Sequence, residues 1–144
     1  FSVYGPMGRP DLVIFRFIKW IIENQPVEVF GDGTQSRDFT FVDDVANATI
    51  AALKPVGYEV FNIGSGRTPT SLSQILSLIE EYTEKKAEIV FKEFNNADIL
   101  TSKADISKAR KILGWNPTVA MKDGLNFCIE DYLNNIDFAA GVNL

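Results

Sequence analysis

The 144-residue sequence contains no histidine and a single cysteine, Cys128. Without histidine the chain lacks the commonest general base, the usual pH switch near neutrality and the ligand found in most zinc sites. A single cysteine excludes a disulfide within the chain and is typical of proteins in a reducing compartment. The sequence therefore predicts a cytoplasmic protein whose chemistry does not depend on imidazole or on a metal-binding cluster.

Basic charge and apolar runs of membrane length are also absent. The 14 Lys and Arg residues are outnumbered by 19 Asp and Glu residues, and the formal net charge is −5, so a basic footprint for nucleic acid is not expected. The apolar stretch 12–22 contains Arg16 and Lys19 and is too short to cross a bilayer. We therefore expect neither nucleic acid nor membrane as a partner, and a bound anion must be held by a few local arginines.

What remains is an ordinary globular composition, with 46% hydrophobic residues, that suits one compact domain. The pattern of apolar residues predicts strands and helices that alternate along the chain, which is typical of an α/β fold. The strands are expected at residues 1–4, 27–30, 37–42, 58–63 and 87–91. The helices are expected at residues 11–24, 44–53, 71–85, 104–113 and 122–134.

Helix starts are indicated by short polar side chains just before the apolar periods. Asp11 is expected to cap the first helix, and Asp43 or Asp44 the second. Ser71 and Gln74 have the spacing of a capping box for the third helix. Asp43 and Asp44 could also form half of a metal site, but their position before a helix favours capping.

Two glycine pairs, Gly31 with Gly33 and Gly64 with Gly66, begin like the loop that binds dinucleotide phosphates. Neither supplies the third glycine of that loop, which close packing of a helix on a strand requires. The first pair precedes a predicted strand, and Pro69 separates the second pair from its helix. We interpret both pairs as tight turns.

Tyr82 and Lys86 have a Y-x-x-x-K spacing, which places a phenol and an ammonium on one helix face. The ammonium could lower the pKa of the phenol and create an acid–base pair. Glu80, Glu81 and Glu84 lie on the same helix, however, and their carboxylates would raise that pKa. A solvated helix end is therefore the preferred interpretation.

Cys128 lies on the apolar face of the last predicted helix. No histidine is available to activate its thiol, so we interpret it as a core residue rather than a nucleophile. No catalytic residue is therefore predicted within these 144 residues.

Arginines are concentrated in the first half of the chain, at Arg9, Arg16, Arg37 and Arg67. Arg9 and Arg37 lie in predicted loops, where a planar guanidinium can bind phosphate or carboxylate. Pairing of each arginine with a nearby aspartate is the alternative.

Five segments together resemble a known group of enzymes: FSVYGPMGRPD at 1–11, VFGDG at 29–33, SRDFTFVDDV at 36–45, FNIG at 61–64 and KADISKARKILGWNP at 103–117. They are similar to the C-terminal half of nucleotide-sugar epimerases and dehydratases of the extended short-chain dehydrogenase/reductase family. The resemblance is strongest to UDP-glucuronate 4-epimerases and extends to about residue 134.

The resemblance implies a site that binds a UDP-sugar. Ser2 and Arg9 would hold the carboxylate of the sugar, Arg37 the diphosphate and Asp98 the ribose, and Phe30 would line the uracil pocket. In the loop before Asp98, Asn95 stands where these enzymes usually carry a longer Arg or Gln near the phosphate. The expected substrate-binding residues are Ser2, Arg9, Leu12, Phe30, Arg37 and Asp98.

The resemblance also implies NAD in a longer parent enzyme, held by an N-terminal glycine loop and used by a catalytic Tyr–Lys pair. Neither motif occurs here in that setting, and the sequence opens on Phe1 rather than Met. We therefore expect a single substrate-binding fragment, 1–144, with a small mixed sheet and packed helices. The N-terminal Rossmann domain would be absent, and the fragment alone would bind no cofactor and be inactive.

Within this fragment, residues 1–42 would supply substrate-contacting loops and the first helix, and 65–135 the C-terminal helical and strand part. Residues 43–64 would return to the missing nucleotide-binding sheet, and without it an open strand edge and apolar surface predict self-association. Two alternatives stay open: a nucleotide-sugar dehydratase or decarboxylase of the same superfamily, and a stand-alone, non-enzymatic binding or interaction module.

Overall fold

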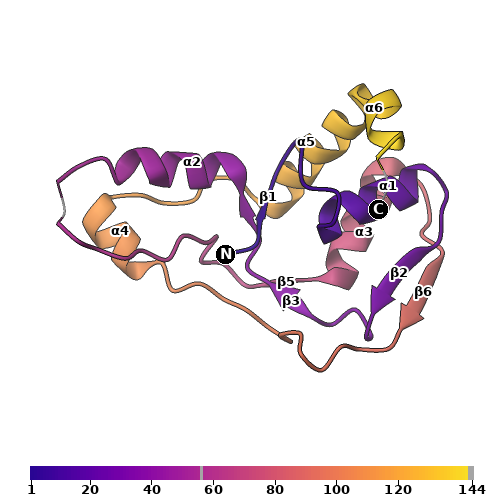
Figure 1. Cartoon of the computed structure of the whole chain (residues 1–144), viewed down its shortest axis with the longest axis horizontal. Helices are drawn as coiled ribbons and strands as arrows, with labels where there is room; N and C mark the ends of the chain where they lie inside the picture. The colour runs from indigo at the N-terminus through magenta and orange to yellow at the C-terminus, as the bar shows by residue number, and fades with distance from the viewer. Residues whose placement is uncertain (56, 143–144) are drawn as a thin grey trace.

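A computed structural model describes residues 1–55 and 57–142 of the chain (Figure 1). Its helices and strands alternate, which confirms the predicted α/β class, and α2 and α4 lie at the opposite end of the molecule from α1, α3 and β2. The elements are β1 (Val3–Tyr4), α1 (Val13–Ile22), β2 (Val27–Phe30), β3 (Ser36–Arg37), β4 (Thr40–Phe41), α2 (Val42–Ala51), β5 (Thr70–Ser71), α3 (Leu72–Thr83), β6 (Ile89–Lys92), α4 (Ser107–Leu113), α5 (Met121–Asn134) and α6 (Ile136–Ala140).

The strands of the described residues form three separate pairs instead of one small mixed sheet. β2 runs parallel to β6, from Val27 opposite Ile89 to Phe30 opposite Lys92. β1 is parallel to β4, and β3 is antiparallel to β5. Parallel strands require a long crossover, and α2 and α3 both lie in the chain between β2 and β6.

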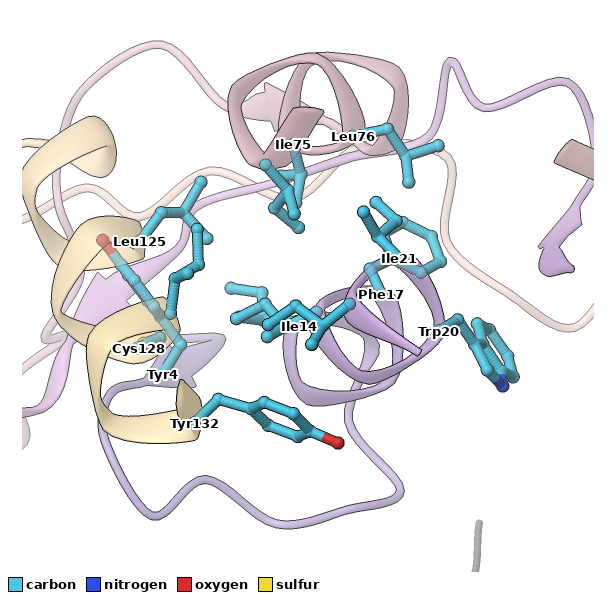
Figure 2. Close-up of a cluster of buried hydrophobic side chains, with 14 of the residues drawn as sticks. Tyr4, Ile14, Phe17, Trp20, Ile21, Ile75, Leu76, Leu125, Cys128 and Tyr132 are labelled. Carbon is cyan, nitrogen blue, oxygen red and sulfur yellow. The ribbon is translucent and has the colours of Figure 1, made fainter. Parts of the chain in front are cut away.

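Most of the buried apolar side chains gather around α1, α3 and α5 (Figure 2). α1 is apolar on nearly every face, so it lies in the middle of this cluster. One face of the helix is not covered by the cluster. α3 and α5 each contribute a single apolar face at helical spacing. The best-buried members are Phe17, Ile18, Ile21, Val27, Val29, Ile75, Ile79, Leu125 and Ile129.

The predicted capping box at the start of α3 is confirmed. The Ser71 hydroxyl accepts a hydrogen bond from the Gln74 backbone N–H at 3.2 Å, and the Gln74 carboxamide oxygen accepts one from the Ser71 N–H at 2.8 Å. Two of the four N–H groups that a helix start leaves open are satisfied in this way. The next two N–H groups, of Leu72 and Ser73, donate to the carbonyl oxygens of Gln35 at 3.0 Å and Gly33 at 3.0 Å, so the local capping box and a distant loop together satisfy this helix start.

The caps predicted from aspartates are wrong. α1 follows Leu12 and receives no side-chain cap, because the Asp11 carboxylate binds Arg9 instead. α2 follows Phe41, and Asp44 lies inside its first turn, buried. There the Asp44 carboxylate accepts hydrogen bonds from the backbone N–H of Thr118 at 2.8 Å and of Val119 at 3.1 Å.

The strand predicted at 37–42 is divided between β3 and β4, which belong to different pairs. Asp38 causes the break, because its side chain is buried and takes three backbone partners from distant loops. Its carboxylate accepts hydrogen bonds from the N–H groups of Ser65 at 2.6 Å, Gly66 at 3.2 Å and Ala104 at 3.0 Å.

The strand predicted at 58–63 is also wrong. This segment is extended coil with no partner strand among the described residues, and the side chain of Tyr58 is 96% exposed. Phe61 and Ile63 pack partly against a second, smaller cluster that α2 and α4 share. An apolar alternation predicts a strand only where a neighbour offers its hydrogen-bonding edge.

The C-terminal part follows the prediction with shifted boundaries. β6 begins two residues later than expected, and α4 starts at Ser107, whose backbone N–H is held by the Asp105 carboxylate at 2.9 Å. The short α6 was not predicted, because five residues carry too little periodicity. No helix in the described ranges combines the length and apolarity needed to span a membrane.

Candidate functional site

A pocket of about 880 Å³ lies between the loop after β1, one face of α1 and the end of β2. Its wall includes all six residues that the sequence resemblance singled out, although they come from four separate segments of the chain. This is a statement about position, and their role in substrate binding stays a prediction. The six residues are Ser2, Arg9, Leu12, Phe30, Arg37 and Asp98.

One stripe of α1 forms a long side of this pocket. Its residues recur at the three- to four-residue spacing that keeps side chains on one helix face. Sequence reasoning named only the first of them, Leu12, although the same spacing continued from Leu12 could have found the others. The stripe consists of Leu12, Val13, Arg16, Phe17 and Trp20.

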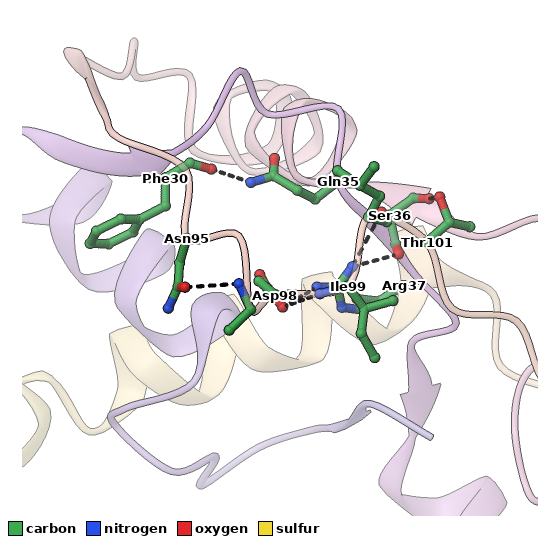
Figure 3. A network of polar contacts seen from close by, with 10 residues as sticks. Phe30, Gln35, Ser36, Arg37, Asn95, Asp98, Ile99 and Thr101 are labelled. Carbon is green, nitrogen blue, oxygen red and sulfur yellow. Dashed lines mark hydrogen bonds and ion pairs between the residues drawn. The ribbon is translucent and has the colours of Figure 1, made fainter.

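Arg37 and Asp98 are brought together from positions 61 residues apart (Figure 3). Arg37 Nη2 donates to Asp98 Oδ1 at 2.7 Å, and Nη1 donates to the carbonyl oxygens of Ser36 at 2.9 Å and Leu100 at 3.3 Å. These bonds fix the plane of a mostly buried guanidinium that has five N–H donors in total. Arg37 is thus held rigidly while part of its donor capacity stays available to a ligand.

Phe30 ends β2 at the rim of the pocket and leaves nearly half of its side chain exposed. Its carbonyl oxygen accepts a hydrogen bond from the Gln35 carboxamide beneath it (Figure 3). Gly31 follows directly with φ = 81°, a left-handed conformation that suits glycine and turns the chain away. The backbone at Phe30 is thus held while its ring is open to the pocket, where an aromatic ring can stack on a planar ligand group.

Ser2 lies directly before β1 and Arg9 lies in the loop after it, and both line the pocket. Arg9 forms two hydrogen bonds with the Asp11 carboxylate, Nε to Oδ1 at 3.0 Å and Nη2 to Oδ2 at 2.5 Å. The hydrogen bond from Arg9 lowers the pKa of Asp11. Both side chains are well exposed, so water screens the pair and a ligand carboxylate can compete for Arg9.

The Tyr82 and Lys86 side chains do not act on each other. The Tyr82 hydroxyl donates to Glu130 at 2.8 Å, which raises the pKa of the phenol, and Lys86 pairs with Glu80 at 3.0 Å. The interpretation of this Y-x-x-x-K spacing as a solvated helix end is confirmed.

Cys128 is buried in the main core, and burial raises the pKa of its thiol to about 12. A thiol with that pKa is almost entirely protonated at neutral pH and is a poor nucleophile. The structure therefore confirms a core role for Cys128.

The two glycine pairs do not fit a dinucleotide site. Gly31 leads into β3 rather than into a helix. A Cβ on Gly64 would lie 2.3 Å from the Ala104 Cβ, and one on Gly66 would lie 2.5 Å from Ile106 Cδ1. These glycines allow close packing within the protein, and neither pair forms the glycine loop that cradles a dinucleotide pyrophosphate.

Residues 1–64 match the NAD dependent epimerase/dehydratase family. The UDP-glucuronate 4-epimerase of Thermodesulfobacterium geofontis (strain OPF15) is 48% identical over 144 residues, which cover 100% of this chain and 45% of that protein. The chain is homologous to the NAD-dependent epimerases and dehydratases. The resemblance seen in the sequence is thereby confirmed.

Further members of this epimerase/dehydratase group are similar in structure and sequence. The solved UDP-glucuronic acid 4-epimerase from Bacillus cereus in complex with UDP-glucuronic acid and NAD is 40% identical, with a TM-score of 0.88 over 93% of this chain and 43% of that chain. UDP-glucuronic acid decarboxylase 4 of Arabidopsis thaliana is 30% identical over 138 residues, 94% of this chain and 31% of that protein. The chain therefore spans less than half the length of these relatives.

Proposed function

We propose that this chain is the UDP-sugar-binding part of an NAD-dependent nucleotide-sugar 4-epimerase, with a UDP-hexuronate or UDP-hexose as substrate. The observation that carries the proposal is the single pocket that contains all six expected residues. NAD and the catalytic Tyr–Lys pair would belong to the rest of a longer parent enzyme in the cytoplasm, and this chain alone would bind no cofactor and be inactive.

Each expected contact has a physical basis in the pocket. The fixed guanidinium of Arg37 suits the diphosphate, and the partly exposed ring of Phe30 suits the uracil. Asp98, which is half exposed beside Arg37, has acceptor capacity for a ribose hydroxyl. Leu12 adds apolar surface between these groups.

The sugar carboxylate is assigned to Ser2 and Arg9. A hydroxyl and an arginine fork are a matched set of donors for a carboxylate, and Arg9 is held only by an exposed ion pair with Asp11. A bound carboxylate would replace Asp11 as the partner of Arg9. This favours a UDP-hexuronate over a neutral UDP-hexose.

Calorimetric titration of the 144-residue chain with UDP, UDP-glucuronate and UDP-glucose tests the proposal. We expect UDP-glucuronate to bind more tightly than UDP-glucose, and Arg9→Gln to remove that difference while leaving UDP binding unchanged. Arg37→Gln should weaken all three ligands by about tenfold. Equal affinities for the two sugars, unaffected by Arg9→Gln, would contradict the carboxylate assignment.

Inactivity of the chain alone is tested by incubation with UDP-glucuronate and NAD, followed by separation of the C4 epimers. We expect no conversion. Any epimer formed by the pure 144-residue chain would show that its own residues suffice for the reaction.

We further propose that residues 43–64 pack against the nucleotide-binding sheet of the parent. The exposed apolar side chains of α2 and of the segment after it support this placement, because exposed apolar surface of this extent usually meets a partner. In the isolated chain the same surface would drive self-association.

A decarboxylase or dehydratase is the second candidate for the parent, because carboxylate binding by Ser2 and Arg9 suits a decarboxylase equally well. A product assay on a longer parent separates these activities: an epimer keeps the substrate mass, whereas the others lose carbon dioxide or water. A stand-alone binding module is the third candidate, and UDP bound by this chain more tightly than about 10 μM, together with a longer parent that converts no UDP-sugar, would favour it.

A further inference from the structure

Three arginines line the large pocket, and they differ in how their charge is compensated. Arg9 and Arg37 are each paired with an aspartate of the pocket wall, Asp11 and Asp98. Arg16, on the pocket stripe of α1, forms no ion pair and no hydrogen bond with any of the residues that the structure describes. Its Nε atom is buried without a partner.

The guanidinium of Arg16 is nevertheless held in place. It lies over the ring of Trp20, one helical turn later, with the Arg16 Cζ atom 4.6 Å from the ring centroid. Trp20 is itself buried at the edge of the main cluster, so this platform is rigid (Figure 2). A cation over an indole face is attracted to it, but this contact leaves the N–H groups in the guanidinium plane unused.

The carboxylates of the pocket wall are already occupied. Each one forms an ion pair with a cation other than Arg16, so among the described residues Arg16 has no carboxylate in direct contact, although its charge still acts on Asp11. An anionic oxygen supplied by a ligand in the pocket would give the guanidinium a direct ionic partner and an acceptor for its Nη donors, which unlike Nε are not buried. The wall pairs are Asp11 with Arg9, Glu28 with Lys92 and Asp98 with Arg37.

We propose that Arg16 is a second diphosphate-binding residue of this pocket, donating hydrogen bonds to phosphate oxygens alongside Arg37. The inference rests on the proposed function, in which the ligand is a UDP-sugar. Uridine is neutral and the sugar carboxylate is assigned to Ser2 and Arg9, so the diphosphate is the anionic group left to meet Arg16. Arg16 thereby adds affinity for a nucleoside diphosphate over a nucleoside.

The test compares Arg16→Gln with the wild-type chain and with Arg110→Gln, by calorimetric titration with UDP, uridine and inorganic pyrophosphate. Arg110 is an exposed arginine outside the pocket, so Arg110→Gln matches the change in net charge. We expect Arg16→Gln to weaken UDP by about tenfold or more and uridine by less than twofold, while Arg110→Gln changes neither. Arg16→Lys, which keeps the charge but loses the fork, should be intermediate.

A melting temperature of Arg16→Gln close to that of the wild-type chain shows that the loss is local. UDP affinity unchanged in Arg16→Gln but weakened in Arg37→Gln would overturn the inference and leave the proposed function standing. Equal weakening of UDP and uridine would place Arg16 at the base and also overturn it.

If the wild-type chain binds no UDP, the proposed function fails, and pyrophosphate decides the inference independently. Pyrophosphate binding that Arg16→Gln weakens would support an anion site at Arg16. Pyrophosphate binding that is absent, or insensitive to Arg16→Gln, would overturn it.

Discussion

The two ends of the molecule cover their apolar residues to very different degrees. Around α1, α3 and α5 the cluster is closed, and Ile75 at its centre is 0% exposed. Around α2 and α4 the cluster is small, and Leu53 just beyond α2 is 82% exposed. The first end has a large buried core that can position a pocket, although Phe91 and Phe138 stay exposed on its surface, whereas the second end has only a small cluster beneath its exposed apolar residues.

Buried carboxylates, rather than apolar contacts, join the second end to the first. The Asp38 carboxylate accepts hydrogen bonds from backbone N–H groups of the 64–66 turn and of Ala104. The Asp44 carboxylate accepts them from Thr118 and Val119, just before α5. A buried charge that accepts several N–H bonds is stabilising only while every bond is made. The junction should therefore be less tolerant of mutation than its small apolar cluster suggests.

The largest effect is expected at the closed end. Ile75→Ala should lower the free energy of unfolding by about 2–5 kcal/mol, because it leaves a cavity in a fully packed cluster. Ile50→Ala, on the exposed face of α2, should change it by less than about 0.5 kcal/mol. Urea unfolding followed by circular dichroism measures both, and similar losses for the two variants would break the comparison.

Prediction from sequence succeeded where local periods and local caps decide the structure. The apolar repeat of 71–85 and its capping box need only neighbours within one turn, so α3 was predicted almost to the residue. The caps predicted at Asp11 and Asp44 were wrong because other partners take their carboxylates. Asp11 pairs with Arg9, and Asp44 accepts a hydrogen bond from Thr118, 74 residues away. The strand predicted at 58–63 failed because the edge it needs is not among the described residues.

The candidate site divides in a similar way. Charge and loop position pointed to Arg9 and Arg37, but the full set of six residues came only from the resemblance of sequence motifs. Arg16 was not among the expected binding residues because it lies within a predicted apolar helix and not in a loop. Only the three-dimensional arrangement shows that it shares a pocket with Arg9 and Arg37 and that no aspartate pairs with it.

The junction between the two ends gives the next largest effect. Asp44→Asn should destabilise the chain by about 2–3 kcal/mol, because the carboxamide accepts fewer hydrogen bonds and turns an N–H group toward another donor. Asp43→Asn is the control, since Asp43 is exposed in the same helical turn. Equal melting temperatures for the two variants would show that the Asp44 bonds do not hold the two ends together.

The dry interior of the closed end predicts a loss of stability at alkaline pH. Burial raises the pKa of Cys128 from 9.0 to about 12, so between these values the unfolded chain loses a proton that the folded chain keeps. Stability must then fall as pH rises, by about 1.4 kcal/mol at pH 10 for this thiol. Between pH 8 and pH 10, the free energy of unfolding of Cys128→Ala, measured with urea, should therefore fall by about 1.4 kcal/mol less than that of the wild-type chain. An equal fall in the free energy of unfolding for the two proteins would mean that water reaches the thiol in the folded chain.

Substitutions at the end that contains α2 and α4 should have the smallest effect on the free energy of unfolding and a clear effect on self-association. Leu53→Glu combined with Tyr58→Glu should change the free energy of unfolding by less than about 0.5 kcal/mol, since both side chains are exposed. If the open face drives self-association, sedimentation velocity should show the wild-type chain forming dimers or larger species as its concentration rises, and the double variant staying monomeric.

Phe91→Glu is the matched control, because Phe91 is an exposed apolar residue of β6 at the closed end. Its substitution should leave the association of the wild-type chain unchanged. Association abolished by Phe91→Glu but retained by the double variant would move the interface to the β2–β6 edge, and a wild-type chain that is monomeric at high concentration would remove the case for self-association. Either result would mean that exposed apolar area alone does not identify the docking face of this chain.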